Sequence, residues 1–205
     1  SSGTTGLILA LQAVGLQPGE GVILPSFTFM AAAQAVLYAG GVPIFSEVGE
    51  DLTLSPTDLG NCLQAHSHIA AVFPVHMSGM PCQVNAIQDV VNHFRRKRRR
   101  SIALVYDAAH AFGSARDGIR VGNFGDAEAF SFSATKALVS IEGGMVASRN
   151  ADLIHRIRKM RNYGIEQNYN THWPGLNGKM SELHAIIGIH NLRKLDEMLA
   201  TRARN

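Results

Sequence analysis

FSFSATK, residues 130–136, continues a strand-like apolar stretch and ends on Lys136. A second apolar run, Ile102–Tyr106, stops immediately before Asp107. Runs of this kind, bounded by polar residues, predict buried strands. The carboxyl ends of parallel strands meet at one edge of a sheet, where loops and helix N-termini converge and ligands bind. We therefore expect the aspartate and the lysine to share one site.

Apolar runs rich in Val, Ile and Phe recur along the whole chain and alternate with amphipathic stretches. The predicted strands are Gly21–Leu24, Val42–Val48, Ile69–Val75, Ile102–Tyr106, Ala127–Ser131 and Met145–Ser148. Helical patterns between them cover Leu7–Val14, Thr28–Tyr38 and Val84–Phe94. This alternation predicts an α/β fold built on a mostly parallel mixed sheet flanked by helices.

The composition indicates one soluble globular domain, with 205 residues, 46% of them hydrophobic and 17% charged. The apolar runs are too short and too interrupted to cross a membrane. Ser1–Leu11 lacks the basic head and cleavage site of a signal peptide, so we expect a cytoplasmic location. Cys62 and Cys82 have no metal-ligand spacing and are expected to be reduced thiols.

The segment Arg95–Arg100 reads RRKRRR and concentrates positive charge in a chain whose net charge is only +3. We interpret it as a solvated helix end and loop before the next strand, and a contact with a polyanion or nucleotide stays open as the alternative. No aromatic residues interrupt the run to stack on bases, so we expect no nucleic-acid partner.

The chain changes character after Asn150. Ala151–Arg161 has a helical pattern, whereas Asn162–Lys179 is rich in Gly, Asn and aromatic residues and has no clear period. Long ordered loops are usually functional, so a lid or a subunit contact is expected here. Met180–Met198 returns to a helical pattern, after which we expect a polar tail.

The residues at the predicted sheet edge meet the needs of pyridoxal 5'-phosphate. A lysine amine such as that of Lys136 can form a Schiff base with an aldehyde. A buried carboxylate such as that of Asp107 can keep a pyridine ring nitrogen protonated, and the Ser131 hydroxyl can bind a phosphate. Taken singly, each has an ordinary alternative: a surface lysine, an aspartate that caps the next segment, and a serine that ends a strand.

Residues near these three have two interpretations each. SSGTTG, residues 1–6, opens the first helix either as an anion site of free N–H groups or as a plain N-cap. Phe29 is either a platform for a flat ring or a core aromatic, and His110 contacts the same ligand or serves as a structural hydrogen-bond partner. If the strand continues past Ser131, we expect Ser131 and Ser133 to point to opposite faces, so that only one of them faces the ligand. His76 ends a strand too, but no chemistry requires it.

These segments together resemble the DegT/StrS-like sugar aminotransferases, a branch of the fold-type I pyridoxal phosphate superfamily typified by aspartate aminotransferase. The resemblance is collinear and covers nearly all of the chain. Its motifs are SSGTTG at 1–6, PSFTFMA at 25–31, PVHMSG at 74–79, DAAHAFG at 107–113, FSFSATK at 130–136, RNYG at 161–164 and GLNGKMSELHA at 175–185.

The resemblance implies specific roles at the cofactor ring. Lys136 would hold the cofactor and then move a proton between it and the substrate carbon. Asp107 would pair with the pyridine nitrogen. Phe29 would stack on the ring, and His110 would contact the cofactor near its phenolic oxygen. A lysine at 136 also distinguishes this chain from related dehydratases, which carry histidine there.

The resemblance also implies a phosphate site shared between two subunits. Thr4, Thr5 and Ser131 would hold the phosphate, the two threonines mainly through backbone N–H groups. Asn177, and with it Lys179, would reach the phosphate region of the partner subunit, which implies an obligate homodimer with shared active sites.

The implied reaction is a two-stage transamination in which glutamate is the amino donor and a nucleotide-linked keto sugar, preferably a 4-keto-6-deoxy sugar, is aminated. By this resemblance, residues 1–205 would correspond to the cofactor-binding large domain, without the N-terminal segment and the C-terminal small domain of the family. Gly178, where an aromatic is frequent, and the basic run depart from the family pattern. Another fold-type I activity such as a lyase, and a truncated noncatalytic dimerising or regulatory homologue, stay open as alternatives.

Overall fold

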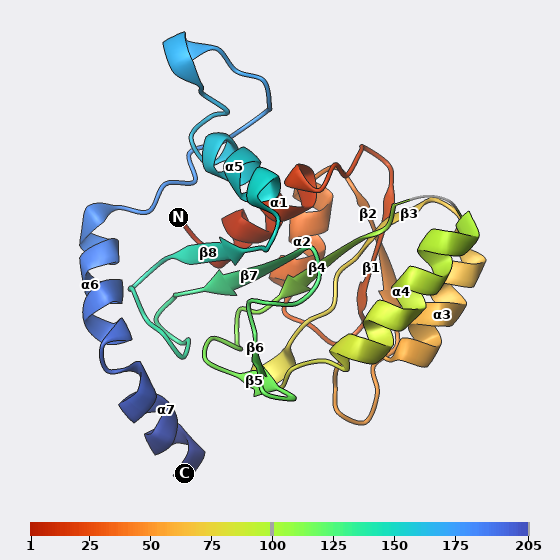
Figure 1. Cartoon of the computed structure of the whole chain (residues 1–205), viewed down its shortest axis with the longest axis horizontal. Helices are drawn as coiled ribbons and strands as arrows, with labels where there is room; N and C mark the ends of the chain where they lie inside the picture. Colours follow the sequence, from red (N-terminus) through yellow and green to blue (C-terminus); the bar gives the residue numbers. More distant parts are fainter. Residues whose placement is uncertain (99–100, 205) are drawn as a thin grey trace.

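A six-stranded sheet forms the centre of the computed structural model, which describes residues 1–98 and 101–204 (Figure 1). The strand order is β2-β1-β3-β4-β7-β8, and all neighbours are parallel except β7 and β8. The strands are β1 (Gly21–Pro25), β2 (Val42–Ser46), β3 (Ile69–Val72), β4 (Ala103–Asp107), β7 (Ala127–Ser131) and β8 (Gly144–Ala147). The predicted mostly parallel mixed sheet is confirmed, with all six strands within a few residues of their expected bounds.

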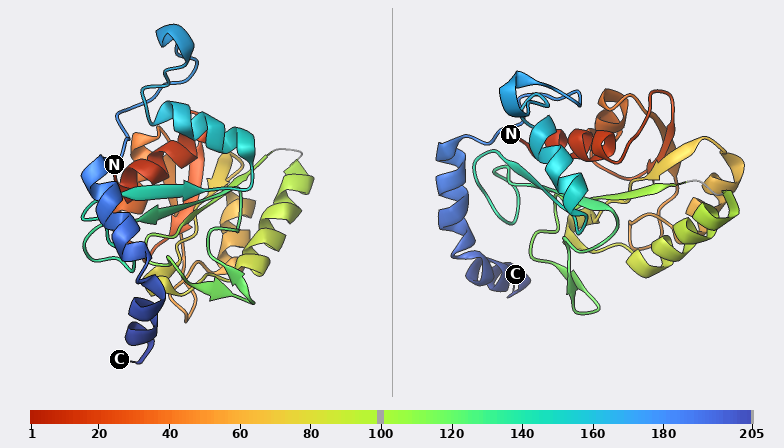
Figure 2. Two further views of the ribbon diagram at one scale, coloured as in Figure 1. Left: turned by 60° about the vertical axis from the view of Figure 1, so that its left-hand side comes forward. Right: turned by 45° about the horizontal axis from the view of Figure 1, so that its top comes forward.

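Helices cover both faces of the sheet, which gives three layers (Figure 2). One face packs against α1 (Gly3–Ala13), α2 (Met30–Tyr38) and α5 (Ala151–Met160), and the other against α3 (Pro56–Ala65) and α4 (Val84–Arg98). The alternation of side chains along β1 shows the division, because Val22 and Leu24 join the first core cluster and Ile23 joins the second. All three of these side chains are fully buried.

Three elements were not anticipated by the sequence pattern. Helix α3 begins with Ser55 as its N-cap, Pro56 in its first turn and Asp58 near the positive end of its dipole. Strands β5 (Ala115–Arg116) and β6 (Ile119–Arg120) form a separate antiparallel hairpin.

The C-terminal region is more helical than expected. Two helices, α6 (Glu182–Leu192) and α7 (Leu195–Arg204), replace the single predicted one, and the polar residues expected after Met198 lie in α7, which continues through Arg204. Leu195 at the start of α7 is buried in a small apolar cluster, which holds this helix against the body. The predicted long loop is confirmed, with one short 3₁₀ turn at Gln167–Tyr169, and Figure 1 shows it projecting from the body.

The basic run is a helix end, as expected, but several of its side chains are bonded rather than simply solvated. Arg95 pairs with Asp126 at 2.8 Å, and Lys97 bonds to the side chain of Gln64 at 2.8 Å. Arg98 donates to the carbonyls of Leu63 and His66 at the end of α3. The described part of the run therefore joins α4 to its neighbours, whereas its residues 99 and 100 lie outside the described ranges.

Within the described ranges, the helices are too short or too polar to span a bilayer. Cys62 and Cys82 are both free, as predicted. The same part of the chain contains no group of three or more His, Cys, Asp or Glu side chains arranged to hold a metal ion.

Candidate active site

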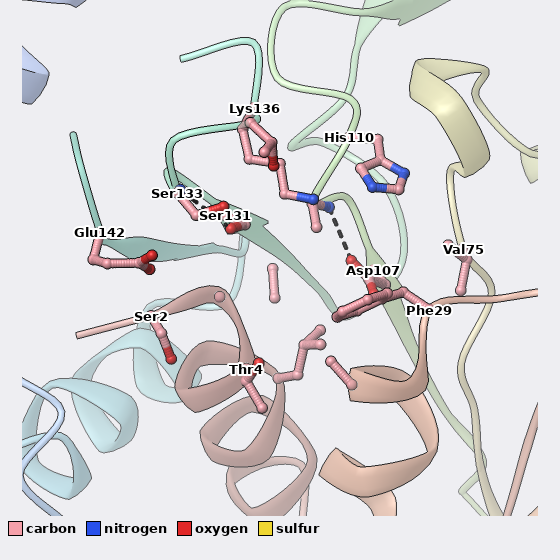
Figure 3. A pocket seen from close by; sticks show the side chains of 16 residues that line it. Ser2, Thr4, Phe29, Val75, Asp107, His110, Ser131, Ser133, Lys136 and Glu142 are labelled. Carbon is pink, nitrogen blue, oxygen red and sulfur yellow. Dashed lines mark hydrogen bonds between the residues drawn. The ribbon is translucent and has the colours of Figure 1, made fainter. Parts of the chain in front are cut away.

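A cavity of about 290 Å³ opens at the carboxyl ends of β4 and β7, beside the N-termini of α1 and α2 (Figure 3). Its polar lining comes from segments that are distant in sequence. The lining residues are Ser2, Gly3, Thr4, Leu7, Phe29, Ala31, Val75, Asp107, Ala109, His110, Ala129, Ser131, Ser133, Thr135, Lys136 and Glu142. The sheet edge predicted to bind a ligand therefore does carry a cavity, and it brings together Thr4, Phe29, Asp107, His110, Ser131 and Lys136.

Asp107 places a buried carboxylate in the wall of this cavity. Only 5% of the residue is exposed, and its Oδ1 accepts the N–H of Ala109 at 2.9 Å. Burial raises the pKa of the Asp107 carboxyl above its usual range, and the Ala109 N–H and the positive charge of Lys136 offset part of that rise. A cation bound in the cavity would stabilise the ionised form, as a protonated pyridine nitrogen would do.

Lys136 lies in the turn that follows β7. Its backbone N–H donates to the carbonyl of Ser133 at 3.0 Å, and its side chain extends across the cavity toward Asp107 and His110 (Figure 3). The lysine and the aspartate thus share one cavity, 29 positions apart in the sequence. This arrangement suits a ligand that reacts with the amine at one atom and presents a cationic nitrogen at another.

His110 is half-buried beside Lys136. Its Nδ1 accepts the N–H of Ser78 at 3.3 Å. Burial, and then the nearby charge of Lys136, lowers the pKa of the His110 imidazole. This shift favours the neutral form of the ring in the cofactor-free protein.

Phe29 lies at the mouth of the cavity as the residue that precedes α2. It is 62% exposed, so the alternative that it is a core aromatic was wrong. An exposed aromatic ring beside the Asp107 carboxylate offers a face for stacking (Figure 3). Its contact with a bound ring remains a prediction.

The N-terminus of α1 forms the floor of the cavity through Ser2, Gly3 and Thr4. Thr5 is not part of this lining, because its N–H donates to the side chain of Ser2 at 3.1 Å and its own side chain lines a second cavity beside Arg161. The start of α1 therefore lines the cavity with Thr4 but not with Thr5, and the binding of an anion there remains a prediction.

Gly3 permits the close approach of α1 to the end of β7. A Cβ at this position would lie 2.7 Å from the Cβ of Ser131, which is closer than two carbon atoms can pack. A larger residue would therefore push the helix N-terminus away from the serine hydroxyl.

We expect Gly3→Ala to lower the free energy of unfolding by about 1–3 kcal/mol and to weaken phosphate binding, measured by thermal melts and phosphate titration. Gly60→Ala is the matched control, because, apart from its chain neighbours and the nearby backbone of its own helix, no described atom lies within 4 Å of its Cβ position. Alanine there should raise the free energy of unfolding by about 0.5–1 kcal/mol, since it favours the helix. Equal effects of the two substitutions would contradict the close-approach role of Gly3.

Ser131 and Ser133 both line the cavity. The expectation that only one of them faces it was wrong, because residues two positions apart along a strand point to the same face, not to opposite ones. The two serines are also linked, since the N–H of Ser133 donates to the Ser131 hydroxyl at 3.4 Å. Hydroxyl donors are therefore more numerous here than the sequence pattern indicated.

Glu142 and Thr135 are cavity residues that sequence reasoning missed. Glu142 begins the segment EGGM, residues 142–145, which follows the lysine closely in the sequence. Nothing in that segment indicated that the Glu142 side chain faces the cavity. In Figure 3 this carboxylate lies on the same side of the cavity as Ser2 and Ser133. Its negative charge lies away from Asp107, at the end of the cavity where the helix N-terminus is.

Asn177 and Lys179 do not line the cavity of their own chain. Asn177 forms an isolated bridge with Asn162, and the Lys179 amine donates to the Asn162 side chain at 3.1 Å. The Lys179 amine also lies 4.8 Å from the centre of the Tyr163 ring. The predicted role of both residues in a partner subunit remains a prediction.

The lining residues fit pyridoxal 5'-phosphate by their chemistry. Lys136 supplies the amine, Asp107 supplies the buried carboxylate, and Phe29 supplies an aromatic face. The α1 N-terminus and Ser131 supply N–H and hydroxyl donors at the far end.

The model of the DegT/DnrJ/EryC1/StrS aminotransferase family matches residues 1–205. The chain belongs to this family. It is 34% identical over 207 residues to the GDP-perosamine synthase of Caulobacter vibrioides, a match that covers 100% of this chain and 54% of that protein. It is 36% identical over 188 residues to a UDP-N-acetyl-3-dehydro-alpha-D-glucosamine 3-aminotransferase of Acidithiobacillus ferrooxidans, covering 91% and 49% of the two proteins.

The fold is shared with solved sugar aminotransferases of the DegT/DnrJ/EryC1/StrS family. DesV of S. venezuelae, solved in complex with a ketimine intermediate, superposes with a TM-score of 0.86 and 33% identity over 96% of this chain and 51% of that one. The chain thus spans about half the length of the curated relatives it matches, 54% and 49% in the two cases above.

Proposed function

We propose that residues 1–205 are the cofactor-binding large domain of a pyridoxal phosphate-dependent aminotransferase that acts on nucleotide-linked keto sugars. The observation that carries this proposal is the placement of Lys136 and Asp107 in one cavity at the sheet edge. When bound, the cofactor would supply an aldehyde carbon that takes up the amino group and passes it on, and a ring that accepts electrons. Everything else in the reaction is positioning and proton transfer by the chain.

Each lining residue has a defined task in this proposal. Lys136 binds the cofactor's aldehyde carbon and, once released, moves a proton at the substrate carbon. Asp107 holds the proton on the ring nitrogen, because its buried carboxylate is stabilised by a cation. Phe29 covers the ring, and the α1 N-terminus and Ser131 hold the phosphate.

The relatives support the substrate class. One is named a GDP-perosamine synthase and another a 3-aminotransferase of a UDP-linked 3-dehydro sugar, so relatives of similar identity differ in the nucleotide and in the sugar. We propose a 4-keto-6-deoxy sugar nucleotide as acceptor and glutamate as donor.

The test is to load the protein with pyridoxal phosphate and to supply glutamate and a 4-keto-6-deoxy sugar nucleotide. We expect amino sugar and 2-oxoglutarate in equal amounts, measured by mass spectrometry. Release of ammonia or pyruvate without amino sugar would show a lyase instead. Binding of the cofactor with no product from any keto sugar nucleotide would favour a noncatalytic role.

We further propose a homodimer in which Asn177 reaches the cavity of the partner subunit. Asn177 does not line its own cavity, and the neighbouring helix α6 leaves Leu183, Ile186 and Ile189 more than half exposed. An apolar helix face of this kind is typical of a surface that another subunit covers.

Mixing two inactive variants tests the shared site. In the proposed dimer each site uses Lys136 of one subunit and Asn177 of the other. A dimer of one Lys136→Ala chain and one Asn177→Ala chain therefore has one complete site and one site that lacks both residues. We expect equal mixtures to recover about a quarter of the wild-type activity, since half of the dimers are mixed and each has one active site of two. Activity of the mixture no higher than that of the separate variants would contradict the shared site.

A further inference from the structure

His76 and Glu128 form a buried pair that the proposed function does not use. Both side chains are fully buried, and His76 Nε2 lies 3.1 Å from Glu128 Oε1. The imidazole stacks on Tyr106, with ring centres 4.9 Å apart and planes within 9°. Tyr106 belongs to the core beneath α3 and α4, so the pair lies behind the strand that ends on Asp107.

Glu128 accepts hydrogen bonds from two backbone N–H groups and faces the imidazole of His76. Its Oε2 accepts the backbone N–H of Gly122 at 2.5 Å and that of Phe124 at 2.7 Å, while Oε1 faces His76. With Oε2 occupied by these two backbone donors, Oε1 is the oxygen left to accept a hydrogen bond from His76 Nε2.

His76 also fixes the conformation of the loop that follows it. Its Nδ1 accepts the backbone N–H of Cys82 at 3.0 Å, so Nδ1 carries no proton and the proton resides on Nε2. The Cys82 thiol lies 2.9 Å from the carbonyl of Val75, and the N–H of Met80 donates to Met77 at 2.8 Å. His76 is the first residue of loop 76–82, and its hydrogen bond to Cys82 holds the last residue of the loop beside it.

This loop presents the backbone N–H of Ser78 to His110. Ser78 has a φ of 52°, in the left-handed region, and its N–H donates to His110 Nδ1 at 3.3 Å. The next residue, Gly79, has a φ of 85° and packs so closely that a Cβ would lie 3.1 Å from the carbonyl of His110. The hydroxyl of Ser114 donates to the Gly79 carbonyl at 2.8 Å and locks the two segments together.

The contact at Nδ1 decides which nitrogen of His110 carries the proton. An atom that accepts a hydrogen bond is unprotonated, so the neutral ring of His110 has its proton on Nε2. Among the described residues, Nε2 has no hydrogen-bond partner, and the ring lines the cavity. The cavity therefore contains an N–H donor beside Lys136.

We propose that His76 and Glu128 are positioning residues for His110. Glu128 fixes the proton of His76 on Nε2, His76 closes loop 76–82, and the Ser78 amide of that loop fixes His110 with its proton on Nε2. The geometry of the chain alone carries this proposal. Only the acceptor of the His110 proton, an anionic oxygen on the bound cofactor ring, rests on the proposed function.

The experiment measures the tautomer of His110 by long-range ¹⁵N–¹H spectra of histidine-labelled protein without cofactor, with the His110 signal assigned by its loss in His110→Gln. We expect the wild-type protein to show the Nε2–H form. An Nδ1–H form in the wild-type protein would overturn the proposal. Because no cofactor is present, this outcome is independent of whether Lys136 reacts with pyridoxal phosphate.

Variants test the route through the pair. In Glu128→Gln the amide oxygen accepts from Gly122 and Phe124, so the NH₂ group faces His76 Nε2. That nitrogen must then accept, which moves the His76 proton to Nδ1. A protonated Nδ1 can no longer accept the Cys82 N–H, so the hydrogen bond that holds the loop is lost. We expect the His110 signal to shift to a mixture of both tautomers. His93→Asn, at an exposed histidine of α4, is the control and should leave the signal unchanged.

A second pair of variants separates positioning from simple loss of packing. We expect His76→Ala to give a mixture of His110 tautomers, whereas His76→Asn, whose side-chain oxygen still accepts the Cys82 N–H, should restore the Nε2–H form. If folded Glu128→Gln and His76→Ala proteins have a lower Tm but an unchanged His110 signal, the pair is structural only and the proposal fails.

Discussion

Lys136→Ala should lower the rate of amino transfer by about a thousandfold or more, because no other residue type supplies a primary amine for the cofactor's aldehyde. The measurement is the rate of 2-oxoglutarate formation from glutamate with the pyridoxal phosphate-loaded protein. The fold should be retained, because Lys136 is only half-buried and its backbone N–H and carbonyl, which the substitution keeps, make its hydrogen bonds to Ser133 and Arg202. We therefore expect a Tm within a few degrees of the wild-type value.

Lys194→Ala is the matched control for this substitution. Lys194 is an exposed lysine between α6 and α7, outside the cavity. Its removal should leave both the rate and the Tm unchanged. A Lys136→Ala protein that retains wild-type activity would exclude Lys136 as the residue that binds and moves protons at the cofactor.

Asp107→Asn should have opposite effects on function and on stability. Function requires a negative charge beside the ring nitrogen, so we expect amino transfer to fall by about a hundredfold or more, measured with saturating cofactor. In the cofactor-free protein the same charge is unfavourable, because burial raises the pKa of the Asp107 carboxyl. Asparagine keeps an oxygen for the Ala109 N–H and removes the buried charge.

The sign of the pH dependence follows from that raised pKa. The folded protein binds the Asp107 proton more tightly than the unfolded chain, so this residue's contribution to stability is largest below the unfolded pKa of about 3.9 and declines as the pH rises through the folded pKa. We expect the cofactor-free Asp107→Asn protein to gain in Tm relative to wild type as the pH rises from acidic to neutral. A Tm difference that is independent of pH, together with unchanged cofactor affinity, would contradict this account.

The features that the sequence predicted are those that depend on local pattern. Apolar runs predicted the six strands, and the polar residues that end two of them, Asp107 and Ser131, marked the sheet edge that carries the cavity. Helix α3 was missed because only Leu59 and Leu63 are buried along it, which gives a weak periodic signal despite clear capping residues. Strands β5 and β6 have two residues each, too few to show an alternation.

The features that the sequence did not predict depend on contacts between distant segments. His76 and Glu128 are 52 residues apart, and no local pattern links them. The position of Thr5 outside the cavity depends on how Ser2 caps α1. These outcomes are set by tertiary packing and by the choice among competing hydrogen-bond partners.

The most direct test of the account is to find the residue that binds the cofactor. The protein is incubated with pyridoxal phosphate, reduced with borohydride and digested, and the modified peptide is identified by mass spectrometry. We expect a phosphopyridoxyl group on Lys136, and none in the Lys136→Ala protein. Modification spread over exposed lysines such as Lys179 or Lys194, with none on Lys136, would contradict the central claim that this cavity holds the cofactor.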